Sequence, residues 1–253
     1  MEIKIEKTTS PKAKPQEGAA LGFGKIFTDH MFIMNYTEGK GWHDPRIVPF
    51  QNLSLSPATM VFHYGQEMFE GLKAYKGKDG KSYLFRPDMN AKRTNATNDR
   101  LVIPQIPVED FVQAVSAVVD VDRDWIPSDP GTSLYIRPYM FGFDPVIGVK
   151  PAQVYQFRAF VTPVGPYFKG GVKPLTVRLS DLDRAAPHGT GHIKAGLNYA
   201  MSLYNIVDAH EQGYDENIYV DAATRTNIEE TGGANVIFIK GNTLVTPKSD
   251  SIL

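Results

Sequence analysis

The sequence predicts an α+β (mixed α/β) fold in two domains, and three observations support this prediction. The expected strands and helices follow one another without the regular βαβ spacing of a doubly wound sheet. A length of 253 residues suits one large domain or two modest ones. Glycine and proline at 165–171 interrupt the pattern after a long strand, so we place an interdomain loop at 170–176 between domains 21–169 and 177–253.

The first domain is expected to follow a flexible lead-in. Residues 1–20 mix charges with Thr, Ser and Pro and lack the apolar core of a signal peptide. Apolar alternation at 22–27 and the apolar run 31–34 are typical of strands. Two further strands, 72–75 and 83–85, flank the turn Lys78-Asp79-Gly80 and predict a hairpin.

The clearest helix lies at 108–125, after a polar, helix-compatible segment at 90–101. Proline and glycine at 126–131 end this helix, and strands are expected at 133–140 and 158–164. The helical repeat contains four apolar residues and one acid, which are Phe111, Val115, Val118, Val119 and Asp122.

The second domain is expected to mix short strands with one helix. Strands are predicted at 175–179, 217–220 and 235–239, and Gly241-Asn242 is typical of a hairpin turn into 244–246. The segment 199–211 predicts an amphipathic helix. The residues that this helix offers for burial are Met201, Tyr204, Val207 and Ala209.

Composition excludes several classes of protein. A net charge of −1 gives no electrostatic reason to bind nucleic acid or an anionic membrane, and no apolar run approaches the roughly 18 residues of a membrane helix. Without cysteine there are no disulfides, thiolate metal sites or cysteine nucleophiles. His188 and His192 have the i, i+4 spacing of zinc ligands, but the glycines between them oppose a helix, so we expect no metal site.

Lys194 is the first candidate for chemistry. It lies among small residues immediately before an apolar helix, in Gly191-His192-Ile193-Lys194-Ala195-Gly196-Leu197-Asn198-Tyr199. A lysine before a helix is most often an exposed surface cation. If the surrounding backbone shields the amine from water, however, desolvation favours its neutral, nucleophilic form, which can react with an aldehyde cofactor.

Two adjacent acids, Glu229 and Glu230, precede a Gly-Gly turn and a predicted strand. Neighbouring residues of an extended chain point to opposite faces, so one acid can turn inward while the other stays solvated. An inward carboxylate needs a cationic partner, and a protonated pyridine ring would supply one. The aromatic segment 63–75 most simply packs into a core, although Tyr64 and Phe69 could line an apolar pocket.

Three separated segments together resemble the branched-chain amino acid aminotransferases, which are pyridoxal-phosphate enzymes of fold type IV. The resemblance runs in collinear order from about Leu21 to Leu253. Family members extend about a further third beyond this point, so we expect the second domain to be incomplete and the 253-residue chain to bind cofactor weakly, with an inactive or poorly folded chain as the alternative. The three segments are Phe69-Glu70-Gly71-Leu72-Lys73-Ala74-Tyr75, Gly131-Thr132-Ser133-Leu134-Tyr135-Ile136-Arg137-Pro138 and Lys194-Ala195-Gly196-Leu197-Asn198-Tyr199.

The resemblance implies four residues that hold pyridoxal 5'-phosphate. Lys194 matches the lysine that forms the Schiff base with the cofactor and moves the substrate proton. Tyr199 matches the tyrosine at the phenolic oxygen, and Glu230 matches the acid at the ring nitrogen, which leaves Glu229 solvated. Arg93 matches the arginine that holds the phosphate, a role that suits the planar fork of a guanidinium.

The family's substrate pocket is aromatic and aliphatic, and it favours branched side chains by burying roughly 0.8 kcal/mol per CH₂. The resemblance also implies that Arg137 receives the distal carboxylate of 2-oxoglutarate or glutamate in the second half-reaction. The apolar pocket would be formed by Phe23, Tyr64, Phe69, Tyr135 and Tyr167.

The expected activity is therefore transfer of the amino group of Leu, Ile or Val to 2-oxoglutarate, by a cytoplasmic homodimer with a role in branched-chain amino acid biosynthesis. The same fold leaves two alternatives, a D-amino acid aminotransferase and an aminodeoxychorismate lyase. A third alternative is an inactive fragment that serves only in interaction or dimerisation.

Overall fold

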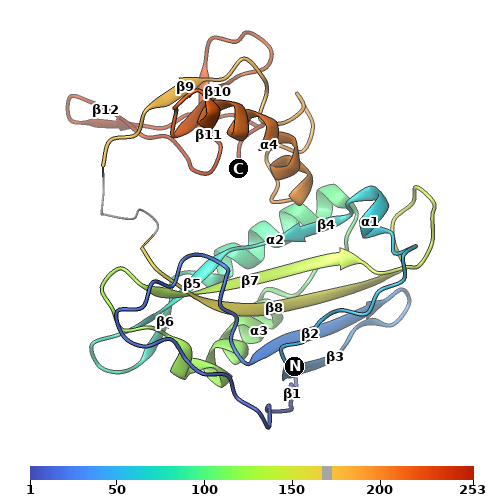
Figure 1. Ribbon diagram of the computed structural model, residues 1–253. Helices are drawn as coiled ribbons and strands as arrows, with labels where there is room; N and C mark the ends of the chain where they lie inside the picture. Colours follow the sequence, from blue (N-terminus) through green and yellow to red (C-terminus); the bar gives the residue numbers. More distant parts are fainter. Residues whose placement is uncertain (167–172) are drawn as a thin grey trace. The chain divides into compact units, whose positions relative to one another are not determined.

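The computed structural model describes residues 1–166 and 173–253, so the expected site residue Tyr167 and part of the expected interdomain loop lie outside the described residues. The chain divides into two compact units, Met1–Lys169 and Gly170–Leu253. The first unit contains one sheet and the second contains two smaller ones (Figure 1), and we describe the two units separately.

In the described part of the first unit, one sheet of eight strands follows the order β1-β3-β2-β8-β7-β5-β6, and β4 also pairs with β7. The pairs are antiparallel except for the parallel pair β1–β3. The predicted strands at 31–34, 72–75, 83–85, 133–140 and 158–164 all belong to this sheet. Its strands are β1 (Lys4–Ile5), β2 (His30–Thr37), β3 (Gly41–Pro49), β4 (Glu67–Phe69), β5 (Leu72–Lys76), β6 (Ser82–Leu84), β7 (Ser133–Gly142) and β8 (Val154–Val164).

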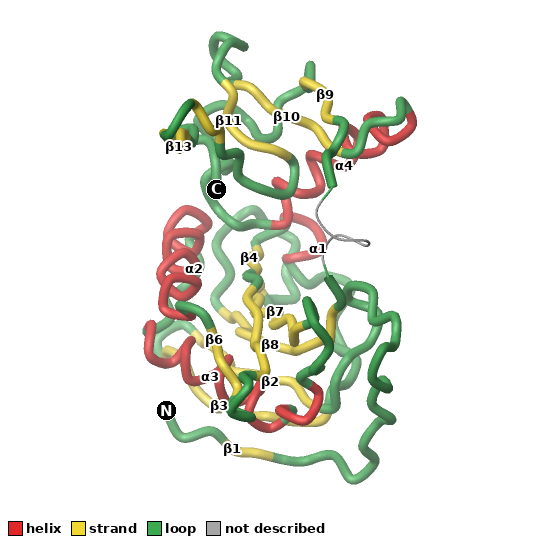
Figure 2. The backbone as a smooth tube through the Cα atoms, turned by 90° about the vertical axis from the view of Figure 1, so that its left-hand side faces the viewer, coloured by secondary structure: helices red, strands yellow, loops and turns green. Residues whose placement is uncertain are grey.

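The helices of this unit are α1 (Val61–Tyr64), α2 (Pro87–Leu101) and α3 (Val108–Val121), and the short 3₁₀ turn η1 (Arg123–Trp125) follows α3. Helices α2 and α3 lie next to each other against the sheet (Figure 2). The predicted repeat of α3 is confirmed, because its four apolar residues are buried in the core, each worth roughly 1.5–3 kcal/mol. Among the described residues, no helix is long and apolar enough to cross a bilayer.

The acid on the repeat of α3 has a specific partner in β2. Asp122 is buried, and its carboxylate accepts hydrogen bonds from the His30 backbone N–H at 3.0 Å and from His30 Nδ1 at 2.6 Å. His30 Nε2 in turn accepts the Thr8 backbone N–H at 2.9 Å, so Nδ1 is the ring nitrogen that carries the donated proton. The buried Asp122 carboxylate therefore has hydrogen-bond donors, and the hydrogen bond from Thr8 to His30 holds the lead-in against the sheet.

The lead-in is held at further points along its length. The Lys12 backbone N–H donates to Asp29 at 2.8 Å, and the Gly18 N–H donates to Asp129 at 2.8 Å. Strand β1, inside the lead-in, pairs with β3. The segment expected to be flexible is therefore bonded to the first unit through its backbone.

The strand expected at 22–27 is wrong, because this segment is irregular. Gly22 and Gly24 have φ angles of +66° and +63°, a left-handed conformation that an extended strand does not contain. The segment still packs on the sheet, since the Phe27 ring stacks on Phe50 at 5.1 Å and meets Phe160 edge-on at 5.6 Å. Apolar alternation here reflects packing of a loop and not strand pairing.

The second unit contains one helix and two small sheets among its described residues. Strands β9 and β10 are parallel and are connected through α4, while β11 pairs antiparallel with β10. The predicted hairpin turn at Gly241-Asn242 is confirmed between β12 and β13. The elements are β9 (Val177–Leu179), α4 (Gly196–Glu211), β10 (Glu216–Val220), β11 (Ile228–Thr231), β12 (Phe238–Lys240) and β13 (Thr243–Val245).

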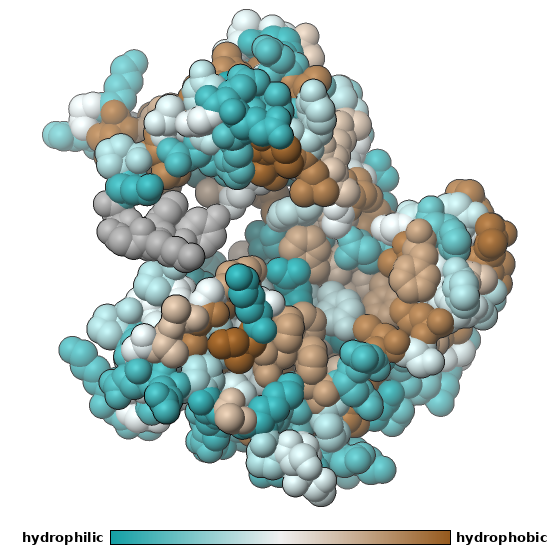
Figure 3. All heavy atoms as spheres, in the orientation of Figure 1, coloured by the Kyte–Doolittle hydropathy of each residue, from teal (hydrophilic) through white to brown (hydrophobic). Residues whose placement is uncertain are grey.

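The predicted burial of α4 is wrong for three of its four residues. Ala209 is buried, but Met201, Tyr204 and Val207 are 47%, 70% and 54% exposed. Figure 3 shows that apolar residues, in brown, reach the surface among the polar ones. The helix instead buries a mostly polar stripe, because its side chains bond to neighbouring loops and strands; the stripe consists of Asn198, Ser202, Asn205 and Ala209.

Candidate active site

Lys194 lies directly before the N-terminus of α4 and points its amine at the first turn of that helix. Its Nζ donates a hydrogen bond to the Tyr199 hydroxyl at 2.7 Å and lies 5.2 Å from the centre of the Tyr199 ring. Lys194 is half-buried and Tyr199 is 37% exposed, which is a more open setting than the sequence-based hypothesis expects. An amine and a phenol in direct contact can share and exchange a proton.

The loop that carries Lys194 is fixed by Asn198, which lies on the first turn of α4. The Asn198 side-chain amide donates to the carbonyl oxygens of Thr190 at 2.6 Å and Ile193 at 2.9 Å, and its oxygen accepts the Thr190 hydroxyl at 2.8 Å. Asn198 and Ile193 are both buried. The backbone on the N-terminal side of Lys194 is therefore held against the helix.

Glu230 is the buried member of the acidic pair on β11, as the sequence predicts for an inward carboxylate. Arg184 Nε forms an ion pair with Glu230 Oε1. Burial raises the pKa of Glu230 to about 7, and the Arg184 charge opposes this rise. Among the described residues, Glu230 Oε1 accepts no hydrogen bond of good geometry.

Arg184 connects Glu230 to the loop before Lys194. Its Nη2 donates to the Gly191 carbonyl oxygen at 2.5 Å and to the Ser251 carbonyl oxygen at 3.2 Å. The sequence analysis did not single out Arg184, because no local pattern links it to an acid that lies 46 residues later in the chain. One guanidinium thus orients both the acid and the segment that leads to the amine.

Glu229 differs from its expected solvated state. It is half-buried, and its Oε1 accepts hydroxyl hydrogen bonds from Ser249 at 2.5 Å and Ser251 at 2.6 Å. A hollow of about 640 Å³ is lined in part by Glu229. Because neighbouring strand residues alternate, Glu229 and Glu230 serve opposite faces of β11.

In the first unit, Arg93 on α2 forms a two-pronged ion pair with Glu70. The Nε donates to Glu70 Oε1 at 2.7 Å and the Nη2 donates to Glu70 Oε2 at 2.9 Å. The Glu70 side chain is fully buried, while that of Arg93 is 39% exposed. Glu70 was not predicted as a site residue, although an acid inside the apolar run of 68–72 is a sequence signal for a buried, paired charge.

The structure also brings four of the predicted substrate residues together in this unit. The Arg137 guanidinium lies 4.6 Å from the centre of the Phe69 ring, and its Nη2 donates to the Tyr135 hydroxyl at 2.9 Å. The Phe23 ring meets Tyr135 edge-on at 4.9 Å. Tyr64 lies on α1, and its ring contacts His63 at 6.1 Å.

Gly71 allows Tyr135 to take its place in the cluster. A Cβ at Gly71 would lie 2.2 Å from the Tyr135 hydroxyl, which is far inside van der Waals contact. Arg137 also has a buried Nε without a hydrogen-bond acceptor among the described residues. The cluster therefore presents a cation, a phenol and two apolar rings, and one guanidinium donor still lacks an acceptor.

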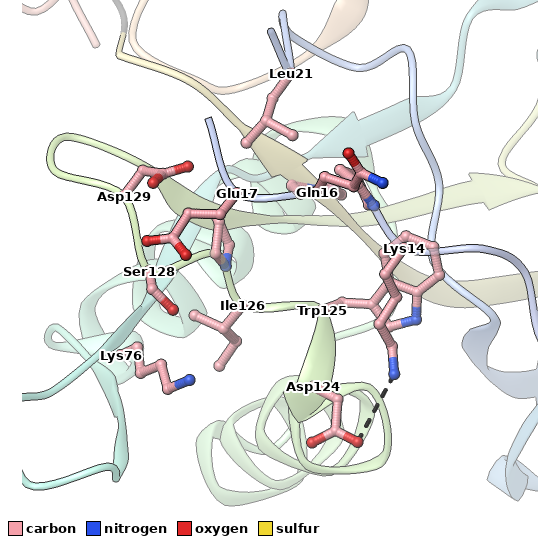
Figure 4. Close-up of a pocket in the computed structure, with 13 residues that line it drawn as sticks. Lys14, Gln16, Glu17, Leu21, Lys76, Asp124, Trp125, Ile126, Ser128 and Asp129 are labelled. Carbon is pink, nitrogen blue, oxygen red and sulfur yellow. Dashed lines mark ion pairs between the residues drawn. The ribbon is translucent and has the colours of Figure 1, made fainter. Parts of the chain in front are cut away.

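A separate hollow of about 220 Å³ lies beneath the lead-in and contains none of the predicted site residues (Figure 4). It is bounded by Lys14 and Leu21 on one side and by residues 124–129 on the other. Its Lys14–Asp124 ion pair is long, at 3.8 Å, and both side chains are strongly exposed. These are features of a solvated crevice, so we place the candidate site in the clusters described above.

Comparison with known proteins agrees with this architecture. A sequence profile described as "Amino-transferase class IV" matches residues 67–253. Among solved structures, the branched-chain aminotransferase of Thermoproteus uzoniensis with norvaline superposes with a TM-score of 0.70 at 23% identity, covering 88% of this chain and 70% of that one. The likeness confirms the predicted α+β class and the fold type IV architecture.

Curated relatives are more similar in sequence. The "Branched-chain-amino-acid aminotransferase 2" of Bacillus subtilis (strain 168) is 45% identical over 246 residues, which cover 97% of this chain and 68% of the relative. The "Probable branched-chain-amino-acid aminotransferase" of Streptomyces coelicolor is 46% identical over 250 residues, covering 97% and 69%. The fold, the site and the relatives together define an aminotransferase that depends on pyridoxal phosphate. The chain belongs to the class IV aminotransferase family.

Proposed function

We propose that this chain is a branched-chain-amino-acid transaminase that uses pyridoxal 5'-phosphate to move the amino group of Leu, Ile or Val to 2-oxoglutarate. The observation that carries the proposal is the amine–phenol contact of Lys194 and Tyr199, in a chain that aligns over 97% of its length with a branched-chain aminotransferase at 45% identity. Several solved relatives are described with pyridoxal phosphate or pyridoxamine phosphate.

The residues present fit this cofactor. The buried Glu230 carboxylate, which already pairs with Arg184, suits a protonated ring nitrogen, and Lys194 supplies the amine that an aldehyde requires. When bound, the cofactor supplies an aldehyde and a ring that accepts electrons. Lys194 Nζ would hold that aldehyde and move the substrate α-proton, Tyr199 would bond the phenolic oxygen, and Arg93 would hold the phosphate.

The aromatic cluster suits the side chain of a branched substrate. Phe23, Phe69 and Tyr135 present ring faces and edges in one place. The family resemblance implies Tyr64 and Tyr167 as further pocket residues, of which Tyr167 lies outside the described residues. Each methylene buried against such rings contributes roughly 0.8 kcal/mol. The Arg137 guanidinium, a cation beside these rings, then binds the distal carboxylate of 2-oxoglutarate or glutamate.

Replacing Arg137 with Gln is expected to separate the two substrates. The loss of a charge-assisted contact of about 1.5–3 kcal/mol raises the KM for 2-oxoglutarate by roughly 10- to 100-fold, because only that substrate carries a second carboxylate. The KM for leucine changes by less than about threefold. Steady-state kinetics, with each substrate varied in turn, measure the change in KM for 2-oxoglutarate and for leucine separately. Arg123→Gln, at a 60% exposed arginine, is the control, and equal effects on both substrates would refute the assignment.

The proposed function is tested by turnover. The purified protein with pyridoxal phosphate is expected to form glutamate from 2-oxoglutarate with Leu, Ile or Val, and not with D-Ala. Activity with D-Ala or release of pyruvate from aminodeoxychorismate would identify one of the other class IV reactions. Borohydride reduction followed by peptide mapping is expected to label Lys194, and no label and no turnover would indicate a non-catalytic role.

We further propose that the protein works as a homodimer in the cytoplasm, as the resemblance to its family implies. The absence of cysteine is compatible with a reducing compartment. Light scattering coupled to size-exclusion chromatography measures the molar mass, and a value of one chain at micromolar concentration would refute the dimer.

A further inference from the structure

Glu70 is a charged residue placed where charge is most costly. It lies between β4 and β5, its side chain is fully buried, and its backbone N–H donates to the Pro138 carbonyl oxygen of β7 at 2.8 Å. A buried carboxylate persists only when donors surround it. Neither the family resemblance nor the proposed mechanism gives this acid a role.

Four N–H donors converge on the Glu70 carboxylate. Arg93 supplies two of them, at 2.7 and 2.9 Å. The Asn90 side-chain amide donates to Oε2 at 2.8 Å, and the Gly71 backbone N–H donates to the same oxygen at 3.1 Å. Glu70 is therefore held from both sides, by the loop that contains it and by the helix α2 that carries Asn90 and Arg93.

This arrangement fixes the plane of one guanidinium. A guanidinium has five N–H donors in a rigid fork, and the pair with Glu70 engages the Nε hydrogen and one Nη2 hydrogen. Since both prongs end on a carboxylate that cannot move, Arg93 is restricted to one rotamer while its side chain remains 39% exposed. Such preorganisation favours binding because the side chain loses little further entropy when an anion arrives.

We propose that Glu70, supported by Asn90, is a positioning residue that presents the Arg93 guanidinium to the cofactor phosphate. The proposal rests on the proposed function, in which Arg93 holds that phosphate. The negative charge of Glu70 weakens the attraction between Arg93 and a dianion. The two hydrogen bonds to Glu70, however, fix the direction of the remaining Arg93 N–H groups. We infer that orienting Arg93 is the more important effect, because the Glu70 carboxylate is fully buried and points its two oxygens at the Arg93 guanidinium.

The test compares two ligands that differ only in the phosphate. Equilibrium titration gives dissociation constants for pyridoxal phosphate and for pyridoxal with the purified protein. Glu70→Gln keeps the size of the side chain, but its amide group faces donors that need acceptors. The variant is expected to bind pyridoxal phosphate about 10- to 100-fold more weakly and pyridoxal within about threefold of wild type. Asp88→Asn, a half-exposed acid on the same helix, is the control.

A milder variant keeps the proposal testable if Glu70→Gln does not fold. Asn90→Ala removes one donor to Glu70 and leaves the Arg93 fork intact, so it is expected to weaken pyridoxal phosphate binding about threefold and leave pyridoxal binding unchanged. Equal losses for both ligands, or no loss in a folded variant, would overturn the role of Glu70. If wild type and Arg93→Gln bind both ligands alike, the phosphate role of Arg93 fails instead, which is a separate result.

Discussion

Replacing Lys194 with alanine is expected to lower kcat for leucine by about 10⁴-fold or more, because one amine both binds the cofactor aldehyde and carries the proton. Removing it ends covalent attachment and general acid–base catalysis together. The visible absorption of wild type and variant, each incubated with pyridoxal phosphate, measures attachment, and single-turnover rates with leucine measure proton transfer.

The neighbouring residues provide the controls for this experiment. Tyr199→Phe removes only the hydroxyl that accepts the Lys194 hydrogen bond at 2.7 Å, so it is expected to retain attachment and to lose about tenfold in kcat. Lys73→Ala removes a lysine outside the proposed site and is expected to change neither measurement. A Lys194→Ala protein that still shows the wild-type spectrum and turns over would contradict the assignment of the amine.

Much of the fold was predictable because it depends on local patterns. The α3 repeat and the 72–85 hairpin are set by residues a few positions apart, and both were confirmed. Lys194 and Tyr199 are also close in sequence, five residues apart across a helix start, so their contact requires only that α4 begins at Gly196.

The missed features depend on distant partners. Glu70 and Arg93 are 23 residues apart, and Arg184 lies 46 residues before Glu230, so no periodic signal connects them. The buried face of α4 was mispredicted for the same reason. Its polar stripe is stabilised by hydrogen bonds such as that from Asn217 to the Asn205 carbonyl oxygen at 2.9 Å, and hydrophobicity alone therefore selects the wrong face.

Replacing Glu230 with glutamine is expected to lower kcat by about 10²- to 10³-fold, because a neutral amide no longer favours the protonated ring nitrogen at the moment when the ring must accept electrons. Steady-state turnover with leucine measures this loss. Glu229→Gln, at the neighbouring acid that bonds Ser249 and Ser251, is the matched control and is expected to stay within about threefold of wild type. Equal losses in the two variants would remove the distinction between these acids.

The raised pKa of Glu230 also predicts that the stability of the cofactor-free protein depends on pH. Burial raises the pKa of Glu230 from 4.5 to about 7, so between these values the folded chain keeps a proton that the unfolded chain releases. The free energy of unfolding therefore falls as pH rises through this window, by about 1–3 kcal/mol, and Glu230→Gln lacks this decrease. Urea unfolding of both proteins from pH 4.5 to 7.5 measures the difference, and parallel curves would show that the pKa of Glu230 is the same in the folded and unfolded chain. Because Arg184 compensates the buried charge of Glu230 only in part, bound pyridoxal phosphate is expected to reduce the decrease by placing a second cation beside Glu230.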